Sequence, residues 1–429
     1  MACVTACTYY DMDDFSREQV PRDKTYSGIH IGMIIVGGVI GIPGFLQAAR
    51  VGGSLGLERA TIAFLAGCFI LGSLGALTSY VGTRTRYSTY MLTGFAFGSA
   101  GGKFVNFIIA LTLVGWYGVI INVFAAAADL VIRDLYGPGV PLWAYIVAGS
   151  ALMVGVTLSG FKGIDKLALC LVPVMLVFLS YAAWLSWDDI PSWNRGSPGA
   201  QPLSYSTAIS SVVGGYIVGV VIQPDYSRFA KNVRHAMWAV FIALWVVQAL
   251  VFFLAAIPSV ATGVSNLIRI MVALGIGVPA FFLLLLSSWC SNVLCLYSSG
   301  LSLSTIFTRA RLWQIILAIG IAGTALAFMY SDDYLIPFLV LLGVTVPPIA
   351  SIYVLDVILI RRGGIDVEKT VAEPAINMNA FTAWGIAVLV GYLAEAERFS
   401  ISGIASLDSI MTATVVYYGL TMLANRGRI

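Results

Sequence analysis

The side chains with the most chemical potential in this sequence are aromatic rings set inside long apolar stretches. Trp116 follows Gly115 in LVGWYGVIINVFAA, and Tyr216 follows two glycines in VVGGYIVG. Tryptophan in membrane proteins usually lies at the interface with water. An indole within an apolar stretch can pack against neighbouring helices or offer a flat face to a planar ligand. A second ring, with a hydroxyl that needs a partner when buried, favours a planar ligand.

Polar side chains occur in the same kind of stretch. The segment SSWCSNVLCLYSSGLSLS contains Ser287, Ser288, Ser291 and Asn292. A serine hydroxyl can bond back to its own helix, whereas an amide is costlier to leave unpaired, so we expect Asn292 to face a cavity or another helix. Further polar candidates are Gln47, Asn122, Asp129 and His30, and for His30, near an end of its stretch, a structural role is at least as well supported.

The sequence offers little material for an enzyme active site. It has two histidines, few acids inside the apolar stretches and no glycine-rich phosphate loop. No basic stripe suggests nucleic acid as a partner. Six cysteines, without metal-type spacing, are expected to be free thiols: Cys3, Cys7, Cys68, Cys170, Cys290 and Cys295. We therefore expect no enzyme and no cofactor.

These rings and amides must be positioned by helices that cross a bilayer. Of the 429 residues, 59% are hydrophobic and 10% are charged, which is too apolar for a soluble fold. Apolar stretches of roughly 20 residues recur along the chain, and lipid offers no partners for free backbone groups, so they should be helices. We expect an all-α integral membrane protein with about twelve transmembrane helices. The expected spans are 27–50, 57–82, 104–132, 141–160, 166–187, 206–224, 235–257, 278–303, 312–330, 334–360, 379–394 and 403–424.

The distribution of basic residues predicts the orientation. With the N-terminus inside, the cytoplasmic segments hold 18 of the 24 Lys and Arg residues, as the tendency of positive loops to stay in the cytoplasm requires. This orientation also places the C-terminus inside and supports an even number of spans. Residues 1–26 carry several acids and no apolar core, so they predict a cytoplasmic tail rather than a signal peptide.

Two of the expected spans contain residues that disfavour a continuous helix. The first has Gly37, Gly38, Gly41 and Pro43 near its middle, and the sixth has Gly214, Gly215 and Gly219 at the same depth. Glycine weakens a helix interior and proline removes a backbone donor. Interruptions five helices apart point to two inverted five-helix repeats around a substrate at the bilayer midplane. The alternative is that the glycines only permit close helix packing.

Charged residues near helix ends are expected to be structural or gating elements. Asp225 and Arg228 in QPDYSRFAKN could form a pair at the cytoplasmic end of the sixth span. Asp356 lies close to Arg361 and Arg362 in sequence and could do the same for the tenth span.

Taken together, the motifs resemble the nucleobase-cation-symport-1 family. The resemblance is carried by VGWYGV at 114–119, VVGGYIVG at 212–219, QPDYSRFAKN at 223–232, LYSSGLSL at 296–303 and VPPIASIYVLDVILIRRGG at 346–364. It implies a leucine-transporter-type fold that works by alternating access, with two inverted repeats plus two further helices. The implied division is a tail at 1–26, repeats at 27–187 and 188–360, and a loop, two helices and a short tail at 361–429.

The resemblance also implies roles for individual residues. In the family a third-helix tryptophan and a sixth-helix ring sandwich a planar heterocycle, and eighth-helix amides bind its polar edge; these roles carry over to Trp116, Tyr216 and Asn292. Val218 stands where the cytosine-transporting branch has a small polar residue, and Asn292 is all that remains of the amide cluster, which puts cytosine itself in doubt.

The cation site implied by the resemblance is also altered. In the family, paired eighth-helix hydroxyls join carbonyls of the broken first helix, near Gly41, in a sodium site. Here only Ser291 keeps its hydroxyl, beside Cys290, and sodium prefers oxygen to thiol ligands. The coupling ion, sodium or a proton, stays open. The predicted substrate-binding residues are Trp116, Tyr216, Val218, Asn292 and Gln47. The predicted cation-binding residues are Ser291, Cys290 and Gly41. The predicted gating or structural residues are Gly37, Gly38, Pro43, Gly214, Gly215, Gly219, Asp225 and Arg228.

The function expected from these observations is cation symport of a nucleobase or a related small planar heterocycle, such as cytosine, inward across a cytoplasmic membrane. An amino-acid or amine transporter of the same fold is the nearest alternative, but the two rings argue against it. A channel should show rings of pore-lining charge or a carbonyl filter, and a receptor should show a substantial signalling domain; neither is evident in the sequence.

Overall fold

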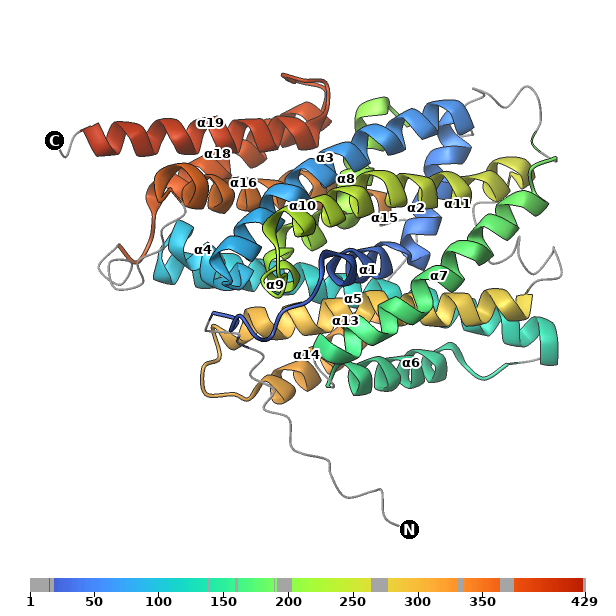
Figure 1. Ribbon diagram of the computed structural model, residues 1–429. Coiled ribbons are helices and arrows are strands. Elements are labelled where there is room, and N and C mark those ends of the chain that lie inside the picture. The colour runs from blue at the N-terminus through green and yellow to red at the C-terminus, as the bar shows by residue number, and fades with distance from the viewer. Residues whose placement is uncertain are drawn as a thin grey trace, which may run out of the picture.

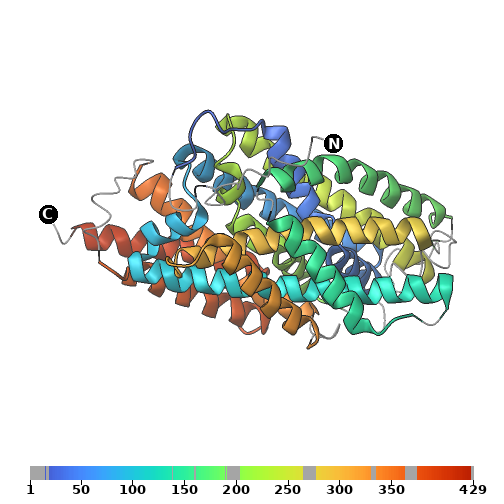
Figure 2. The same ribbon diagram turned by 90° about the horizontal axis from the view of Figure 1, so that it is seen from below.

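The computed structural model describes residues 15, 19–137, 139–158, 161–188, 190, 203–263, 277–329, 335–362 and 374–426. Every element named in this part of the chain is a helix, and the long helices run side by side across the molecule (Figure 1, Figure 2). The helices are α1 (Gly28–Val39), α2 (Ile42–Leu55), α3 (Leu57–Thr85), α4 (Thr89–Phe97), α5 (Ser99–Tyr136), α6 (Leu142–Thr157), α7 (Phe161–Leu185), α8 (Tyr205–Val221), α9 (Pro224–Ser227), α10 (Val233–Ile242), η1 (Ala243–Val247), α11 (Gln248–Thr262), α13 (Gly277–Ser304), α14 (Leu312–Ala327), α15 (Leu335–Thr345), α16 (Pro347–Leu355), η3 (Asp356–Ile360), α18 (Met378–Glu395) and α19 (Ala405–Arg426).

Each expected span coincides with one helix or with consecutive helices. Within the described residues, seven helices are long and apolar enough to cross a membrane, and the bent pair formed by α1 and α2 brings the number to eight. Shorter apolar helices cover 142–157, 172–185 and 312–327. The prediction of a multi-pass, all-α membrane protein is therefore confirmed. The count of twelve and the boundaries of the two repeats stay predictions.

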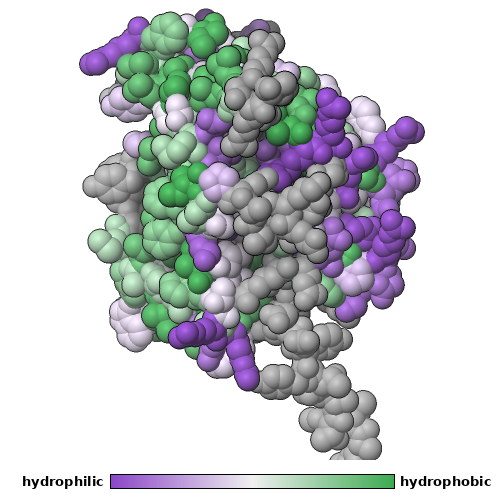
Figure 3. Space-filling model, turned by 90° about the vertical axis from the view of Figure 1, so that its left-hand side faces the viewer, coloured by the Kyte–Doolittle hydropathy of each residue, from purple (hydrophilic) through white to green (hydrophobic). Residues whose placement is uncertain are grey.

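The outer surface fits a lipid environment. Large apolar side chains such as Val177, Trp184 and Val415 are about 70% exposed, at 72%, 69% and 69%, which would be costly in water when it recurs over a whole surface. Figure 3 looks onto one end of the helix bundle and shows hydrophilic side chains gathered on part of it. We call the end where the N-terminal segment lies the basic end: Lys24 belongs to this segment, the amide of Val20 donates to the carbonyl of Arg86, and the amide of Lys231 donates to the carbonyl of Tyr26.

The first expected break is present. Helix α1 ends at Val39, Gly41 is extended with φ −143° and ψ 158°, and α2 starts with Pro43 in its first turn, so that the two helices are bent by 63°. Proline is tolerated at this position because the amide it lacks has no helical partner at a helix start. The end of α1 leaves main-chain carbonyls without intrahelical donors.

The sixth span is interrupted at a different place from the one expected. Helix α8 continues through Gly214, Gly215 and Gly219 and ends at Val221, and the break lies at Ile222 and Gln223, before α9. The glycines instead allow close packing, because a Cβ at position 214 would collide with the main-chain carbonyl of Leu339 in α15. The packing alternative is therefore correct for Gly214, and the expected break was misplaced by about two turns of helix.

Two features were not expected. The tenth span is interrupted at Val346, where α15 gives way to α16 with Pro347 in its first turn, and it ends in the π-helical segment η3. The short helix α4 lies between the second and third spans and packs on α5 and α16. Both features lie against the end of α8, since Tyr353 of α16 and Thr89 of α4 each donate to the carbonyl of Val221.

The thiols agree with expectation where they are described. Cys68, Cys290 and Cys295 are free and at least partly buried. Cys3 and Cys7 lie outside the described residues.

Candidate functional site

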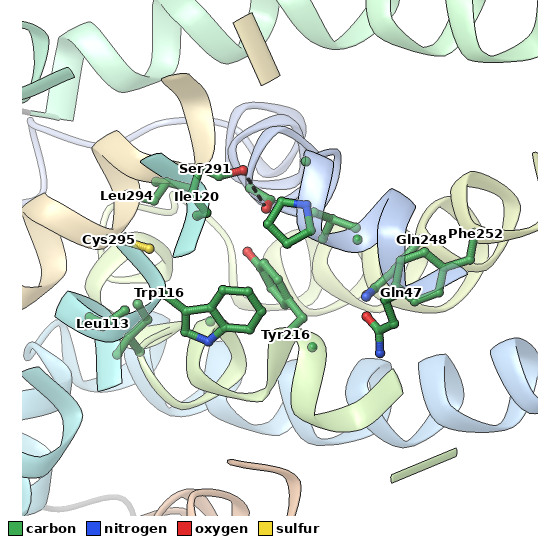
Figure 4. A pocket seen from close by; sticks show the side chains of 18 of the residues that line it. Gln47, Leu113, Trp116, Ile120, Tyr216, Gln248, Phe252, Ser291, Leu294 and Cys295 are labelled. Atoms are coloured by element: carbon green, nitrogen blue, oxygen red, sulfur yellow. Dashed lines mark hydrogen bonds between the residues drawn. The ribbon is translucent and has the colours of Figure 1, made fainter. Parts of the chain in front are cut away.

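A cavity of about 80 Å³ lies where the first break meets the middle of α8. It is bordered by α1, α2, α5, α8, α9, α11 and α13, and its side chains are shown in Figure 4. The residues that line it are Gly38, Val39, Gly41, Pro43, Gly44, Gln47, Leu113, Trp116, Ile120, Gly215, Tyr216, Gly219, Ile222, Tyr226, Gln248, Phe252, Ser291, Leu294 and Cys295. Of the predicted substrate-binding residues, it brings together Trp116, Tyr216 and Gln47.

Both predicted rings reach this cavity. Trp116 of α5 is 9% exposed and rests edge-on against Phe338, with ring centroids 5.6 Å apart at 64°, so one neighbour fixes the orientation of its indole. Tyr216 of α8 fits against the end of α1 because residue 38 is glycine: a Cβ there would lie 2.9 Å from the tyrosine hydroxyl. Figure 4 shows the two rings next to each other on one side of the cavity.

Two amides lie on the other side of the cavity. Gln47 of α2 and Gln248 of α11 are 2% and 1% exposed and line the same space, next to Phe252 (Figure 4). Sequence reasoning named Gln47 but missed Gln248. The signal was available, because Gln248 is the only hydrogen-bonding amide within the apolar segment FIALWVVQALVFF, and buried polar groups in such segments need a partner.

The predicted cation-binding residues divide into two groups. Ser291 of α13 donates from its hydroxyl to the carbonyl of Gly38 at 3.2 Å, and Gly41 lies so close that a Cβ there would be 3.0 Å from the Ser291 hydroxyl. Oxygen atoms of α13 and of the first break therefore meet at the cavity wall. Cys290 is buried but does not line the cavity, because neighbouring residues of a helix point in directions about 100° apart.

Two predicted substrate-binding residues lie elsewhere. Asn292 is fully buried and donates from Nδ2 to the sulfur of Met153 in α6 at 3.0 Å. Val218 is 2% exposed and is absent from the cavity lining. The reason is again helical geometry: Val218 is two positions from Tyr216, and therefore about 200° around α8. Among the predicted gating or structural residues, Gly38, Pro43, Gly215 and Gly219 line the cavity and Gly37 and Gly214 do not.

Side chains at the second break make hydrogen bonds to neighbouring elements. Tyr226 of α9 lines the cavity, and its hydroxyl is 2.7 Å from that of Ser298 in α13. Asp225 accepts from the amide of Thr89 at 2.8 Å through Oδ1. Arg228 donates from Nε to the main-chain carbonyl of Asp225 at 3.1 Å and from Nη1 to the carbonyl of Phe15 at 2.7 Å. Arg228 thus contacts the main-chain carbonyl of Asp225, whereas the Asp225 carboxylate bonds Thr89.

The second predicted charge pair is present. Arg361 and Asp356 form an ion pair with 2.6 Å between Nε and Oδ2, and Tyr417 donates to the other carboxylate oxygen at 2.9 Å. The remaining polar candidates have structural surroundings. Asn122 donates to the carbonyl of Ala327 at 2.7 Å, Asp129 pairs with Arg133 at 2.7 Å, and the ring of His30 lies 5.8 Å from that of Tyr26.

The lining of the cavity is electrically neutral. Among the described residues that form it there is no Asp, Glu, Lys, Arg or His. What it offers is two aromatic faces, two carboxamides, hydroxyls and backbone carbonyls. Such a lining suits an uncharged planar ligand and gives a charged one no counter-charge.

Comparison with known proteins agrees with this geometry. A family model described as permease for cytosine/purines, uracil, thiamine, allantoin matches residues 23–418. Among relatives, cytosine permease of Escherichia coli O157:H7 is 25% identical over 420 residues, covering 96% of both chains. Hydantoin permease of Microbacterium maritypicum is 26% identical over 398 residues, covering 85% of this chain and 80% of that one.

Solved structures show the same fold. Mhp1, a nucleobase-cation-symport-1 family transporter in a closed conformation with bromovinylhydantoin bound, matches with a TM-score of 0.84 and 21% identity over 95% of both chains. A Na⁺-coupled sialic acid symporter in a substrate-bound outward-open state matches with a TM-score of 0.65 and 13% identity, over 94% of this chain and 92% of that one. The leucine-transporter-type fold is thus confirmed. Because the family model covers most of the chain, the protein belongs to the family of permeases for cytosine and purines, uracil, thiamine and allantoin, as the resemblance to the nucleobase-cation-symport-1 family predicted.

Proposed function

We propose that this permease imports a nucleobase or a related small planar heterocycle by cation symport. The observation that carries the proposal is the neutral cavity at the first break, in which Trp116 and Tyr216 present aromatic faces. Base–aromatic stacking contributes about 1–3 kcal/mol per base, which is a large share of the affinity that a one-ring ligand can reach. Cytosine is one candidate, since relatives are named cytosine permease; hydantoins are another.

The first break would supply the coupling site. The Ser291 hydroxyl and the Gly38 carbonyl, 3.2 Å apart, are hard oxygen ligands of the kind that sodium prefers. A cation held there would join α13 to the end of α1. It would thereby favour the arrangement in which the cavity walls are assembled for the heterocycle, and each ligand would raise the affinity for the other. A proton remains the alternative coupling ion.

The second break would act as the gate on the basic end, which we place in the cytoplasm. Tyr226 both lines the cavity and bonds Ser298, and we place this contact between the cavity and the basic end. Release of the substrate to that side would require the contact to open. Asp225 and Arg228 would hold α9 in place through Thr89 and the N-terminal segment. We locate the protein in the cytoplasmic membrane with both termini inside.

Amino-acid or amine transport is less well supported. An ammonium group needs a carboxylate or several carbonyls, and the described lining contains no acid. Binding of the ammonium group of an amino acid would therefore depend on uncharged oxygen atoms of carboxamides, hydroxyls and the backbone.

The test is ligand-induced thermal stabilisation of the purified protein. The panel would contain cytosine, uracil, adenine, hypoxanthine, allantoin, hydantoin and a set of amino acids and amines, each with sodium and with choline as the cation. Stabilisation by one or more of the heterocycles, followed by uptake of that compound into proteoliposomes, is the expected result. Selective stabilisation by an amino acid or amine would overturn the proposed substrate class.

A further inference from the structure

Gln47 and Gln248 form a pair of buried amides at the end of the cavity away from Trp116. They come from α2 and α11, which pack closely: Ser259 of α11 donates to the carbonyl of Ala49 at 3.4 Å, and a Cβ at Gly44 would lie 3.3 Å from the ring of Phe252. The two amides are held in place by this helix pair. Neither lies on α13, where the family resemblance had put the amides.

Each amide has a buried polar atom without a hydrogen-bond partner among the described residues. These atoms are Nε2 of Gln47 and Oε1 of Gln248. Buried polar groups in native proteins are nearly always paired, and the exceptions need an explanation. An amide nitrogen and oxygen can exchange places by a flip of the side chain. In either orientation the pair offers both donors and acceptors.

The position of Gln47 connects this pair to the rings. Its Oε1 lies against α8, where a Cβ at Gly215 would be 2.5 Å away, and Gly215 directly precedes Tyr216. A planar ligand seated against the tyrosine ring can therefore extend its edge toward the amides. Figure 4 shows this arrangement, with Trp116 and Tyr216 on one side and the two glutamines on the other.

We propose that the carboxamides of Gln47 and Gln248 bind the polar edge of the transported ring and select one that carries a hydrogen-bond donor directly beside an acceptor. This inference rests on the proposed function. A carboxamide is complementary to such an edge, because its oxygen receives the ring donor while its nitrogen donates to the ring acceptor. A ring whose edge nitrogens are methylated lacks the donor and leaves an amide oxygen unpaired, which lowers its affinity sharply.

The two glutamines also make a prediction about the empty protein. When an unpaired buried polar group is replaced by an apolar one of similar shape, stability is usually kept or increased. Gln248→Leu and Gln47→Leu should therefore hold or raise the melting temperature without ligand. A glutamine with a purely structural role would instead lower the melting temperature when replaced.

The experiment measures melting temperature and ligand affinity together. Wild type, Gln47→Leu, Gln248→Leu and the control Gln314→Leu would be titrated with uracil, cytosine, hydantoin and 1,3-dimethyluracil. Gln314 is a suitable control because its amide caps the start of α14 and it does not line the cavity. We expect each cavity variant to bind the best unmethylated ring about 10-fold more weakly, with wild-type affinity in the control. The dimethylated ring should bind weakly to wild type, and the variants should not weaken it further.

The outcomes separate this inference from the function on which it rests. If a ring binds wild type and both glutamine variants equally well, the amides do not select it and the inference is overturned, while the proposed function stands. If the dimethylated ring binds wild type as tightly as uracil, the donor requirement is wrong. If no heterocycle of the larger panel binds wild type, the proposed function itself fails.

Discussion

The first break, between α1 and α2, exposes backbone and a hydroxyl to the cavity, whereas the second break, between α8 and α9, reaches the cavity through the side chains of Ile222 and Tyr226 and is held by contacts with neighbouring side chains. At the first, Gly38, Gly41 and Pro43 line the cavity, and a freed carbonyl is matched with the Ser291 hydroxyl. At the second, Tyr226 and Ser298 share a hydrogen bond and Asp225 accepts from Thr89. The two breaks thus differ in the main partners of their polar groups, although both side-chain polar atoms of Gln223 and Oδ2 of Asp225 at the second break have no hydrogen-bond partner among the described residues.

This difference indicates separate tasks for the two breaks. Polar groups that face a cavity are available to a ligand and a cation. Polar groups that bond to each other hold helices together and must be separated before a path can open. A transporter that works by alternating access needs both kinds of site. The following predictions test this division, in order of decreasing effect.

The largest effect is expected from Gly214→Ala, which tests whether the glycines of α8 serve packing. The added methyl group would collide with the carbonyl of Leu339, and overpacking of this kind costs about 1–3 kcal/mol or more. The melting temperature in detergent should fall clearly. Gly53→Ala is the matched control, because nothing lies within 4 Å of the added Cβ. Equal melting temperatures for the two variants would contradict the packing role.

Trp116→Ala tests the cavity at the first break. Loss of one stacking face should weaken binding of the best heterocycle about 10- to 100-fold, measured by titration of the purified protein, while the fraction inserted into the membrane stays unchanged. Trp184→Ala is the control, since Trp184 is 69% exposed on the outer surface of α7. Unchanged affinity in the Trp116 variant would remove the stacking assignment.

Ser291→Ala tests whether the oxygen atoms at the first break hold the cation. With one charge-assisted ligand lost, the apparent sodium affinity in uptake assays should fall about 10-fold, and binding of the heterocycle without sodium should change little. Ser288→Ala serves as control, because Ser288 is buried one turn away and does not line the cavity. If sodium does not change uptake by the wild-type protein, the result favours the proton as the coupling ion.

The smallest effect is expected from Tyr226→Phe, which tests the second break as a gate. Removing the hydrogen bond to Ser298 costs about 0.5–1.5 kcal/mol and should favour opening toward the basic end about 2- to 10-fold. Cys295 lines the cavity, so in a background whose other five cysteines are replaced by serine, its rate of labelling by a membrane-impermeant thiol reagent in inside-out vesicles reports this opening. Tyr392→Phe, at a position 66% exposed, is the control. Slower or unchanged labelling would count against the gate.

Residue types and their positions within the apolar stretches predicted much of the site. Trp116, Tyr216, Gln47, Ser291 and Gly41 were identified because rings, amides, hydroxyls and glycines stand out inside apolar stretches, the cation-site roles of Ser291 and Gly41 being implied by the family resemblance, and all five line the cavity. Errors arose where the side of a helix mattered.

Asn292 and Val218 are at suitable depth but on other faces of their helices. Asn292 meets Met153 of α6 instead of the cavity. A single sequence gives the spacing between residues on a helix but not the rotation of that helix in the bundle. Gln248 stands out as the single amide of its apolar segment, but the segment does not say that this face of α11 packs against α2.

By itself, the sequence determined that the protein is helical and crosses the membrane, because long apolar stretches have no other stable conformation in lipid. It also favoured a break in the first span, since its glycines and Pro43 disfavour a continuous helix, and the structure has this break between Val39 and Ile42. Only the tertiary structure decided where the sixth span breaks, and it showed that α8 stays helical through its glycines because they pack against Leu339. Helix breaking by proline depends on neighbours in the chain, whereas the role of a glycine depends on which helix lies against it.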